Sequence, residues 1–306
     1  MGPIPVVVVG VGKIARDQHL PAIAANPRFR LVAAVSRNGT VDGVPNFTGI
    51  DDYLARGPAG AIALCTPPDV RLEMALAAVA AGRDLLIEKP PASTLGEIDT
   101  IIAAARAAGT VLFATWHSRF APGVGAARDW VAGRRLTGVE IVWREDVRRW
   151  HPGQDWIWRP GGFGVFDPGI NALSILTAIL PDPVLVRAAT MEVPDGAATP
   201  IAARLDIAAG DVPVTADFDW RQEGAQTWDI RLTARDGTLR LSEGGARLAI
   251  DGRPVEVGAP REYPAIYERF ADLIDRRESD ADTEPLRIVA DAGLKGRQVG
   301  AERFEP

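Results

Sequence analysis

The first third of the chain alternates between short, mainly apolar runs and longer amphipathic stretches. Five runs are too short for helices and rich in Val, Ile, Leu and Ala: 6–9, 30–36, 61–66, 84–88 and 111–116. Such runs are typical of strands buried on both faces of a parallel sheet. Between them the pattern predicts helices over 14–25, 69–82 and 95–108. Alternating strands and helices predict an α/β domain with a doubly wound parallel sheet.

After about residue 120 the pattern changes to strands in close succession. Turn residues separate six strand-like runs: 185–193, 201–208, 213–220, 227–234, 238–242 and 247–250. We also expect a strand over 138–147 and helices over 123–133, 168–180, 262–276 and 285–300. Close spacing with Gly, Asp and Pro between strands predicts a large, mainly antiparallel sheet in an α+β domain. The boundary therefore falls between 1–120 and 121–306, with the last helix a candidate to return to the first domain.

A glycine-rich turn, Gly10-x-Gly12-x-x-Ala15, follows the first apolar run and precedes a predicted helix. In a dinucleotide-binding turn the first glycine makes the tight turn and the second lets the backbone approach a pyrophosphate. The small third residue allows the helix to pack closely on the strand. Helix N–H groups then face the phosphates. Strand, glycines and helix in this order predict a Rossmann dinucleotide-binding domain rather than an ordinary glycine-rich turn.

The end of the second predicted strand bears on the choice of nucleotide. An NAD-specific site would place Asp or Glu there to accept a hydrogen bond from the ribose 2′-hydroxyl. Here the strand ends in Ser36-Arg37, and a hydroxyl with a cation suits a 2′-phosphate. We therefore expect NADP as the preferred cofactor, with NAD tolerated. An exposed arginine after a strand is the alternative interpretation.

Ligands of open parallel sheets bind beyond the carboxyl ends of the strands. The residues expected to contact the cofactor there are Gly10, Gly12, Lys13, Ile14, Ser36, Arg37, Thr66, Pro67, Pro68, Glu88, Lys89 and Trp116. His117 follows a strand end at the same edge and is a better candidate than His19, which lies on the first helix. A structural histidine is an equal alternative for His117.

Lys89 is the first candidate for chemistry. It ends a strand at this edge and lies between Glu88 and Pro90. The proline biases Lys89 toward extended geometry and permits a cis peptide bond. A lysine in this place can transfer a proton, and a surface lysine is the equal alternative.

The segment Asp167-Pro168-Gly169-Ile170-Asn171 is the second candidate. Asp before Pro is a standard helix start, so an N-cap is the main structural interpretation of Asp167. Asn171 lies four residues on, and both side chains can face the same way from one turn. Such a pair can hold two hydroxyls of a polyol.

The loop 148–163 is the third candidate, because it holds Trp150, Trp156, Trp158 and His151. Long loops are often functional lids, and flat aromatic faces suit the C–H face of a sugar. Just before it, strand alternation lets Glu145 face the pocket while its neighbours face away. A dimer interface or a satellite core cluster is the alternative.

Composition narrows the classes of partner. The net charge of −6 argues against nucleic acid and against an anionic membrane surface. No apolar run is long enough to span a bilayer and no signal-peptide pattern is present, so we expect a cytoplasmic protein. The single cysteine, Cys65, excludes an intrachain disulfide and a Cys-based metal cluster, and three scattered histidines predict no metal site.

Four motifs, in this order and spacing, resemble those of the glucose–fructose oxidoreductase/inositol dehydrogenase/MocA family. They are Gly10-x-Gly12-x-x-Ala15, Thr66-Pro67-Pro68, Glu88-Lys89-Pro90 and Asp167-x-Gly169-x-Asn171. The longer stretches 12–21, 113–119 and 145–153 resemble, more narrowly, NAD(P)-dependent aldose 1-dehydrogenases acting on L-arabinose and D-galactose. The resemblance covers essentially the whole chain.

This resemblance implies hydride transfer from C1 of a pyranose to C4 of the nicotinamide, which gives an aldonolactone. It implies Lys89 and Asp167 as the catalytic residues. The residues implied to bind the sugar are His117, Glu145, Trp150, His151, Asn171 and Trp228. It also implies a homodimer or homotetramer formed through the open face of the second sheet.

Asn171 departs from much of the wider family, which has His at this place. Asn cannot shuttle a proton, so the base is Lys89 or Asp167. This suits a hemiacetal, whose hydroxyl is more acidic than that of an ordinary alcohol. Two alternatives stay open: a polyol or inositol dehydrogenase of the same family, and a regulator that senses sugar and cofactor without catalysis, because fold alone does not establish catalysis.

Overall fold

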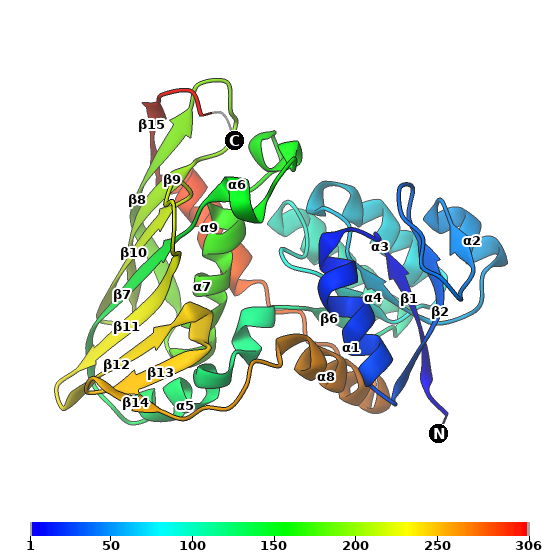
Figure 1. Ribbon diagram of the computed structural model, residues 1–306, viewed down its shortest axis with the longest axis horizontal. Helices are drawn as coiled ribbons and strands as arrows, with labels where there is room; N and C mark the ends of the chain where they lie inside the picture. The colour runs from blue at the N-terminus through cyan, green and yellow to red at the C-terminus, as the bar shows by residue number, and fades with distance from the viewer. Residues whose placement is uncertain (1, 305–306) are drawn as a thin grey trace. The chain divides into compact units, whose positions relative to one another are not determined.

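The structure is a computed structural model that describes residues 2–304. The chain forms two units, one made of residues up to 117 with 262–283 and the other of 118–261 with 284 onward. The helix that joins the first unit is α8 (Glu262–Arg276), whereas the last helix, α9 (Glu284–Lys295), belongs to the second (Figure 1). The sequence suggested the last helix for this role, but the aromatic face of α8 packs on Phe29 and Phe113 of the first unit.

The first unit is built on a six-stranded, wholly parallel sheet in the order β3-β2-β1-β4-β5-β6. Its strands are β1 (Ile4–Val9), β2 (Phe29–Val35), β3 (Asn46–Phe47), β4 (Ala61–Leu64), β5 (Leu85–Ile87) and β6 (Leu112–Ala114). Val6 to Val9 are at most 1% exposed, so β1 is covered on both faces. The strand order reverses between β1 and β4, which places the glycine turn after β1 at the topological switch point.

Helices cover both faces of this sheet. They are η1 (Ala15–His19), α1 (Leu20–Ala25), α2 (Ile50–Arg56), η2 (Pro68–Val70), α3 (Arg71–Ala80), α4 (Leu95–Ala108) and α8. Helix α4 has the predicted bounds, because Thr94 and Glu97 form a capping box and Gly109 ends the helix with φ +66°. Two short elements, β3 and α2, were not predicted, and the first helix winds as a π-helix through His19.

The second unit is built on a nine-stranded sheet in the order β14-β13-β12-β11-β7-β10-β9-β8-β15. Its strands are β7 (Leu136–Arg144), β8 (Val184–Pro194), β9 (Ala202–Ala209), β10 (Val212–Asp219), β11 (Thr227–Ala234), β12 (Gly237–Ser242), β13 (Arg247–Ile250), β14 (Arg253–Val255) and β15 (Arg297–Ala301). Two pairs, β7 with β10 and β8 with β15, are parallel and the others are antiparallel. The prediction of a large, mainly antiparallel sheet is confirmed.

One face of this sheet is covered by α5 (Pro122–Val131), α7 (Phe166–Ile179) and α9 (Figure 1). Strand β10 shows the consequence, since Val214, Ala216 and Phe218 are buried while Pro213 and Thr215 are exposed. Four short helical turns remain. The first, η3 (His117–Phe120), lies where the chain passes into the second unit, and the other three lie within that unit: α6 (Val147–Trp150), η4 (Asp155–Trp158) and η5 (Glu243–Gly245). The segment 148–163 is therefore partly helical rather than a wholly irregular loop.

The helix predicted over 285–300 ends early. It stops at Lys295, and residues 297–301 form β15, which pairs with β8. A Cβ at Gly296 would lie 2.4 Å from the Ala292 carbonyl oxygen and 2.8 Å from the Met191 side chain. Only glycine fits where the chain leaves the helix and turns onto the edge of the sheet. None of the helices within residues 2–304 has the length and hydropathy to cross a membrane.

Candidate active site

The glycine turn after β1 has the geometry of a phosphate cradle. Gly10 has φ +93°, and a Cβ there would lie 2.8 Å from the Thr66 backbone nitrogen, so the turns after β1 and β4 touch. A Cβ at Gly12 would meet nothing within 4 Å, which leaves the space above this backbone open. Lys13 is exposed and paired with Asp17. A tight turn, an open glycine and a helix that starts beside them fit the pyrophosphate of a dinucleotide.

Ser36 and Arg37 follow β2 at the same edge. The Ser36 N–H donates to the Phe47 carbonyl oxygen at 2.8 Å, and Arg37 is exposed. A Cβ at Gly39 would lie 2.8 Å from the Val11 carbonyl oxygen, so this loop packs against the glycine turn. The hydroxyl and the cation thus lie on a loop beside the turn.

Arg71 is a buried residue that the sequence analysis missed. Its Nε–H donates to the Thr66 carbonyl oxygen at 2.7 Å, and its Nη1 donates to the carbonyl oxygens of Glu88 and Pro90. One guanidinium therefore ties the turn of Thr66-Pro67-Pro68 to the turn that carries Lys89. The Lys89–Pro90 peptide bond is cis, and Lys89 is half-buried.

Glu88 is the centre of a second buried cluster. Its Oε1 accepts a hydrogen bond from Tyr263 Oη at 3.0 Å and lies 3.0 Å from His19 Nε2. Its Oε2 accepts the N–H of Lys89 at 2.9 Å. On the far side of the imidazole, Nδ1 lies 2.9 Å from Tyr267 Oη. His19, ranked below His117 from the sequence, therefore joins Glu88 to Tyr267.

The pKa values of His19 and Glu88 shift in the directions that favour an ion pair. Burial by itself raises the pKa of Glu88, but the hydrogen bond and charge of His19, with His117 and Arg71, outweigh it and lower the pKa to about 2. Burial lowers the pKa of His19, whereas Cys65, Tyr267 and Glu88 raise it, and the net pKa is well above the ordinary value. Both shifts favour the charged forms, in which the imidazolium donates to the carboxylate.

His117 and Trp116 follow β6. The His117 ring stacks on Tyr263 with centroids 5.8 Å apart and planes at 20°. The Trp116 indole is buried and donates to the Asp282 carbonyl oxygen at 2.9 Å. Both residues lie at the predicted edge, and both pack on the segment that returns to the first unit.

In the second unit, Glu145 follows β7 and is 3% exposed. Its Oε1 accepts the indole N–H of Trp220 at 3.2 Å, and its Oε2 accepts that of Trp228 at 2.8 Å. The neighbours of Glu145 pair elsewhere, Arg144 with Asp217 and Asp146 with Arg148. Strand alternation predicted this division, but it did not reveal Trp220, which sits fully buried at the end of β10.

Asp167 lies inside α7 and does not cap it. The helix begins at Phe166, and the Asp167 N–H donates to the Gly164 carbonyl oxygen at 2.8 Å. The N-cap interpretation is therefore wrong, because the preceding residues already form the first turn. The Asp167 Oδ2 lies 3.5 Å from His151 Nε2, which is also 3.8 Å from Glu145 Oε1. Asn171 is half-buried one turn further along α7.

The tryptophans of the second unit form two groups. Trp228 stacks on Trp143 with centroids 5.9 Å apart and meets Trp150 at 5.3 Å. Trp158 packs on Trp220 at 5.3 Å and on Phe304 at 6.0 Å. In the first group Trp150 and Trp228 are half-exposed and Trp143 is buried. The second group anchors the segment 148–163 to its own unit, as in the satellite-cluster interpretation.

The predicted cofactor residues thus belong to the first unit, together with His117. The other predicted sugar-binding residues and Asp167 belong to the second. The first unit offers a phosphate cradle and a lysine, and the second offers carboxylates, an imidazole and flat rings. Within residues 2–304, no three His, Cys, Asp or Glu side chains are grouped so that they could hold a metal ion.

The chain is 46% identical to the galactose 1-dehydrogenase of Pseudomonas fluorescens over 306 residues, which is 99% of each chain. Residues 4–115 match the model of the GFO/IDH/MocA oxidoreductase family, described as having an NAD-binding Rossmann fold. The chain belongs to the GFO/IDH/MocA family. Membership of the GFO/IDH/MocA family confirms that the first unit is an NAD(P)-binding Rossmann domain and that the chain is an oxidoreductase.

Solved structures agree. The crystal structure of the D-galactose-1-dehydrogenase of Rhizobium etli matches with a TM-score of 0.96 and 51% identity, over 100% of this chain and 99% of that one. The 3-ketoreductase KijD10 of Actinomadura kijaniata, in complex with NADP and TDP-benzene, matches with a TM-score of 0.86 at 18% identity, covering 98% of this chain and all of that one. The second match shows the shared fold alone.

Proposed function

We propose that this chain is an aldose 1-dehydrogenase that oxidises C1 of D-galactose and L-arabinose in their pyranose forms, with NADP as its preferred acceptor. The observation that carries the proposal is the likeness to two galactose 1-dehydrogenases over the whole chain. The named side chains support it, since the chain holds both a lysine after β5 and, on α7, a carboxylate that lies beside the imidazole of His151. A regulator would need neither.

The reaction removes a hydride and a proton from the sugar and leaves a C1 carbonyl in a lactone. Bound NADP supplies the acceptor, the nicotinamide C4. The proton of the C1 hydroxyl goes to Lys89 or Asp167, and the other of the two orients the hydroxyl oxygen. His151, 3.5 Å from Asp167, orients the carboxylate through its Nε2.

The second unit carries the groups suited to a pyranose. Trp228 and Trp150 present half-exposed rings for the C–H face of the sugar, and Asn171 presents both a donor and an acceptor for hydroxyls. D-Galactopyranose and L-arabinopyranose share their ring stereochemistry and differ in the C5 substituent, so one pocket can accept both.

The test is the absorbance of reduced nicotinamide, with purified protein, NADP and a panel of aldoses, inositol and other polyols. We expect turnover with D-galactose and L-arabinose, and a loss of about 10²–10⁴-fold in kcat for Lys89→Ala, the range of general acid–base catalysis. Lys295→Ala is the matched control, because that lysine binds the Val186 carbonyl oxygen in the second unit. Turnover of polyols alone, or nucleotide binding without turnover of any sugar, contradicts the proposal.

The same assay with Arg37→Ala tests the preference for NADP. Removing a cation from the 2′-phosphate should raise the KM for NADP about tenfold or more, the worth of a charged hydrogen bond, and leave the KM for NAD nearly unchanged. An equal change in both constants would remove Arg37 from the nucleotide site.

A further inference from the structure

The buried cluster around Glu88 connects three distant parts of the first unit. His19 comes from the first helix, Glu88 from the end of β5, and Tyr263 from α8. All three are at most 5% exposed. They meet immediately before Lys89, one of the two residues that the proposed function considers as acceptor of the proton.

We propose that His19, Glu88 and Tyr263 form one positioning unit that holds the backbone of Lys89 in place for catalysis. The proposal rests on the proposed function for the role of Lys89. The positioning itself is a property of the first unit and can be measured without any sugar.

The contacts divide between the two oxygens of one carboxylate. The Glu88 Oε1 lies 3.0 Å from the His19 Nε2 and accepts a hydrogen bond from the Tyr263 Oη, also at 3.0 Å. The Glu88 Oε2 accepts the Lys89 N–H at 2.9 Å. Two donors on Oε1 fix the plane of the carboxylate, so Oε2 is presented to the Lys89 amide in a single direction. Arg71 binds the carbonyl oxygens of Glu88 and Pro90, which holds the Lys89 backbone from both sides.

Energetics favour an orienting role over a stabilising one. A buried ion pair has to offset the desolvation of both charges, and apolar replacements are often equally stable. Removing one partner, however, leaves an uncompensated charge in a dry site. A fully satisfied buried network therefore gives mainly a fixed geometry, and in this chain the group held next to the network is Lys89.

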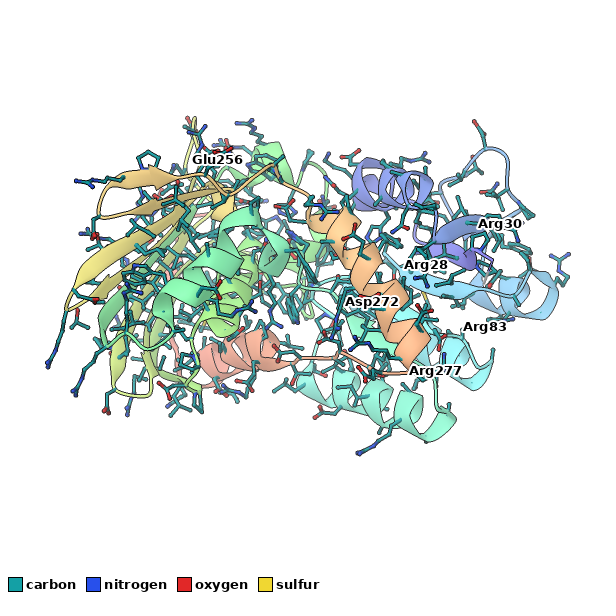
Figure 2. The ribbon with its side chains drawn as sticks, turned by 90° about the horizontal axis from the view of Figure 1, so that it is seen from below. Arg28, Arg30, Arg83, Glu256, Asp272 and Arg277 are labelled. Atoms are coloured by element: carbon teal, nitrogen blue, oxygen red, sulfur yellow. The ribbon has the colours of Figure 1, made fainter. Side chains whose placement is uncertain are left out.

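Helix α8 brings a rigid support to the cluster. Tyr263 and Tyr267 lie four residues apart and so face the same side, and Phe270 continues that face onto Phe29. Ion pairs of Arg28 with Asp275 and of Arg277 with Asp84 tie the C-terminal part of the helix to its own unit. Figure 2 labels Arg28 and Arg277 beside this part of α8. Tyr263 is thus held by a packed helix rather than by a loop.

The decisive variant is Tyr263→Phe, which removes one donor to Glu88 and keeps the ring. Tyr53→Phe is its matched control, because Tyr53 is equally buried in the same unit and donates to the Pro58 carbonyl oxygen at 2.9 Å. We measure kcat and KM for D-galactose, and hydrogen exchange of the Lys89 amide at single-residue resolution. Tyr263→Phe should lower kcat about tenfold or more with KM for sugar and nucleotide within twofold, and should speed exchange at Lys89, since small misplacements of a reacting group cost up to about 10²-fold.

The His19 variants add a rescue. His19→Gln can still place an N–H near the position of Nε2, whereas His19→Ala cannot, so Gln should retain more kcat and slower Lys89 exchange than Ala. Thermal unfolding confirms that each variant is folded. Unchanged kcat and unchanged exchange in Tyr263→Phe overturn the proposal, as does faster exchange with unchanged kcat. A wild-type protein that oxidises no sugar overturns the proposed function instead. In that case the hydrogen exchange of the Lys89 amide still tests whether His19, Glu88 and Tyr263 hold the Lys89 backbone in place.

Discussion

Two buried glutamates, Glu88 and Glu145, have hydrogen-bond partners of different kinds. Glu88 and Glu145 are both 3% exposed and both follow a strand. Glu88 is held by a cation, a phenol and an amide, whereas Glu145 is held by two indole N–H groups. The Glu88 carboxylate accepts the backbone N–H of Lys89 and so orients that part of the chain. The Glu145 carboxylate accepts the indole N–H of Trp228 and so fixes the direction of that ring. The partners around a buried carboxylate therefore decide what it does.

The charge of Glu88 predicts an acid-sensitive contribution to stability. Its pKa is about 2 in the folded chain against an ordinary value of 4.5, so its stabilisation is present above about pH 4.5 and is lost as the pH falls toward 2. The raised pKa of His19 has the opposite sign, with stabilisation present below about pH 6.5 and lost as the pH rises through the folded value. The pair is therefore most stabilising between these limits.

Urea unfolding at pH 7 and pH 3 measures the acid side. The free energy of unfolding of the wild type should fall by about 2 kcal/mol more than that of Glu88→Gln, at about 1.4 kcal/mol for each pKa unit. Equal falls in the two proteins would mean that Glu88 has an ordinary pKa in the fold.

Turns and helix ends decide how the elements of each unit fit together. The turn after β1 can contact the turn after β4 only because Gly10 has no side chain. In the same way, the chain can pass from α9 into β15 only because residue 296 is a glycine. Helix α7 likewise approaches β10 closely at Gly169, where a Cβ would lie 3.0 Å from the Phe218 ring. Glycine acts at these places through close packing, in addition to any freedom of φ.

Gly10→Ala tests this at the nucleotide turn. Gly82→Ala is the matched control, since Gly82 also has positive φ, +69°, but a Cβ there meets nothing within 4 Å. The control should cost about 1–2 kcal/mol of unfolding free energy for the left-handed conformation alone. Gly10→Ala should cost more, because its Cβ meets Thr66 backbone at 2.8 Å, and it should weaken NADP binding as well. Equal costs for the two variants would exclude the close contact.

At the scale of the whole molecule, the sheet of the second unit has one face that the helices of residues 118–261 and 284–304 leave uncovered (Figure 1). The exposed side chains of β7, β9 and β10 carry alternating charges there, with Asp217 between Arg144 and Arg204. Alternating charges on such a face can pair with a second copy of the same face around a two-fold axis. We expect the protein to form a homodimer or homotetramer through this face.

Light scattering after size exclusion measures the assembly. The wild type should show two or four times the 32.7 kDa of one chain, and Thr215→Arg, at an exposed position of β10, should shift the mass toward one chain. Thr100→Arg makes the same change on α4 of the first unit and should leave the mass unaltered. A wild type at the mass of one chain would refute the expectation.

Sequence alone determined most of the fold and the identity of many candidate residues. The alternation of apolar runs and helices predicts the parallel sheet, because a strand that is buried on both faces is apolar along almost its whole length. The glycine turn and the Lys89 and Asp167 motifs could be recognised because their chemistry depends on neighbours a few residues apart. The position of Glu145 followed from strand alternation for the same local reason.

Tertiary structure decided what depends on distant parts of the chain. His19 lies on the same helix face as Ala15, Ala22 and Ile23, and that spacing indicates that its side chain is buried. The sequence pattern does not show its partners Tyr267 and Tyr263, because both come from the distant helix α8. Likewise Trp220 meets Glu145 only because β10 pairs with β7 in register. Periodicity shows which face of an element is buried. Which polar groups meet there depends on pairings between elements far apart in the chain, and no local pattern of residues encodes them.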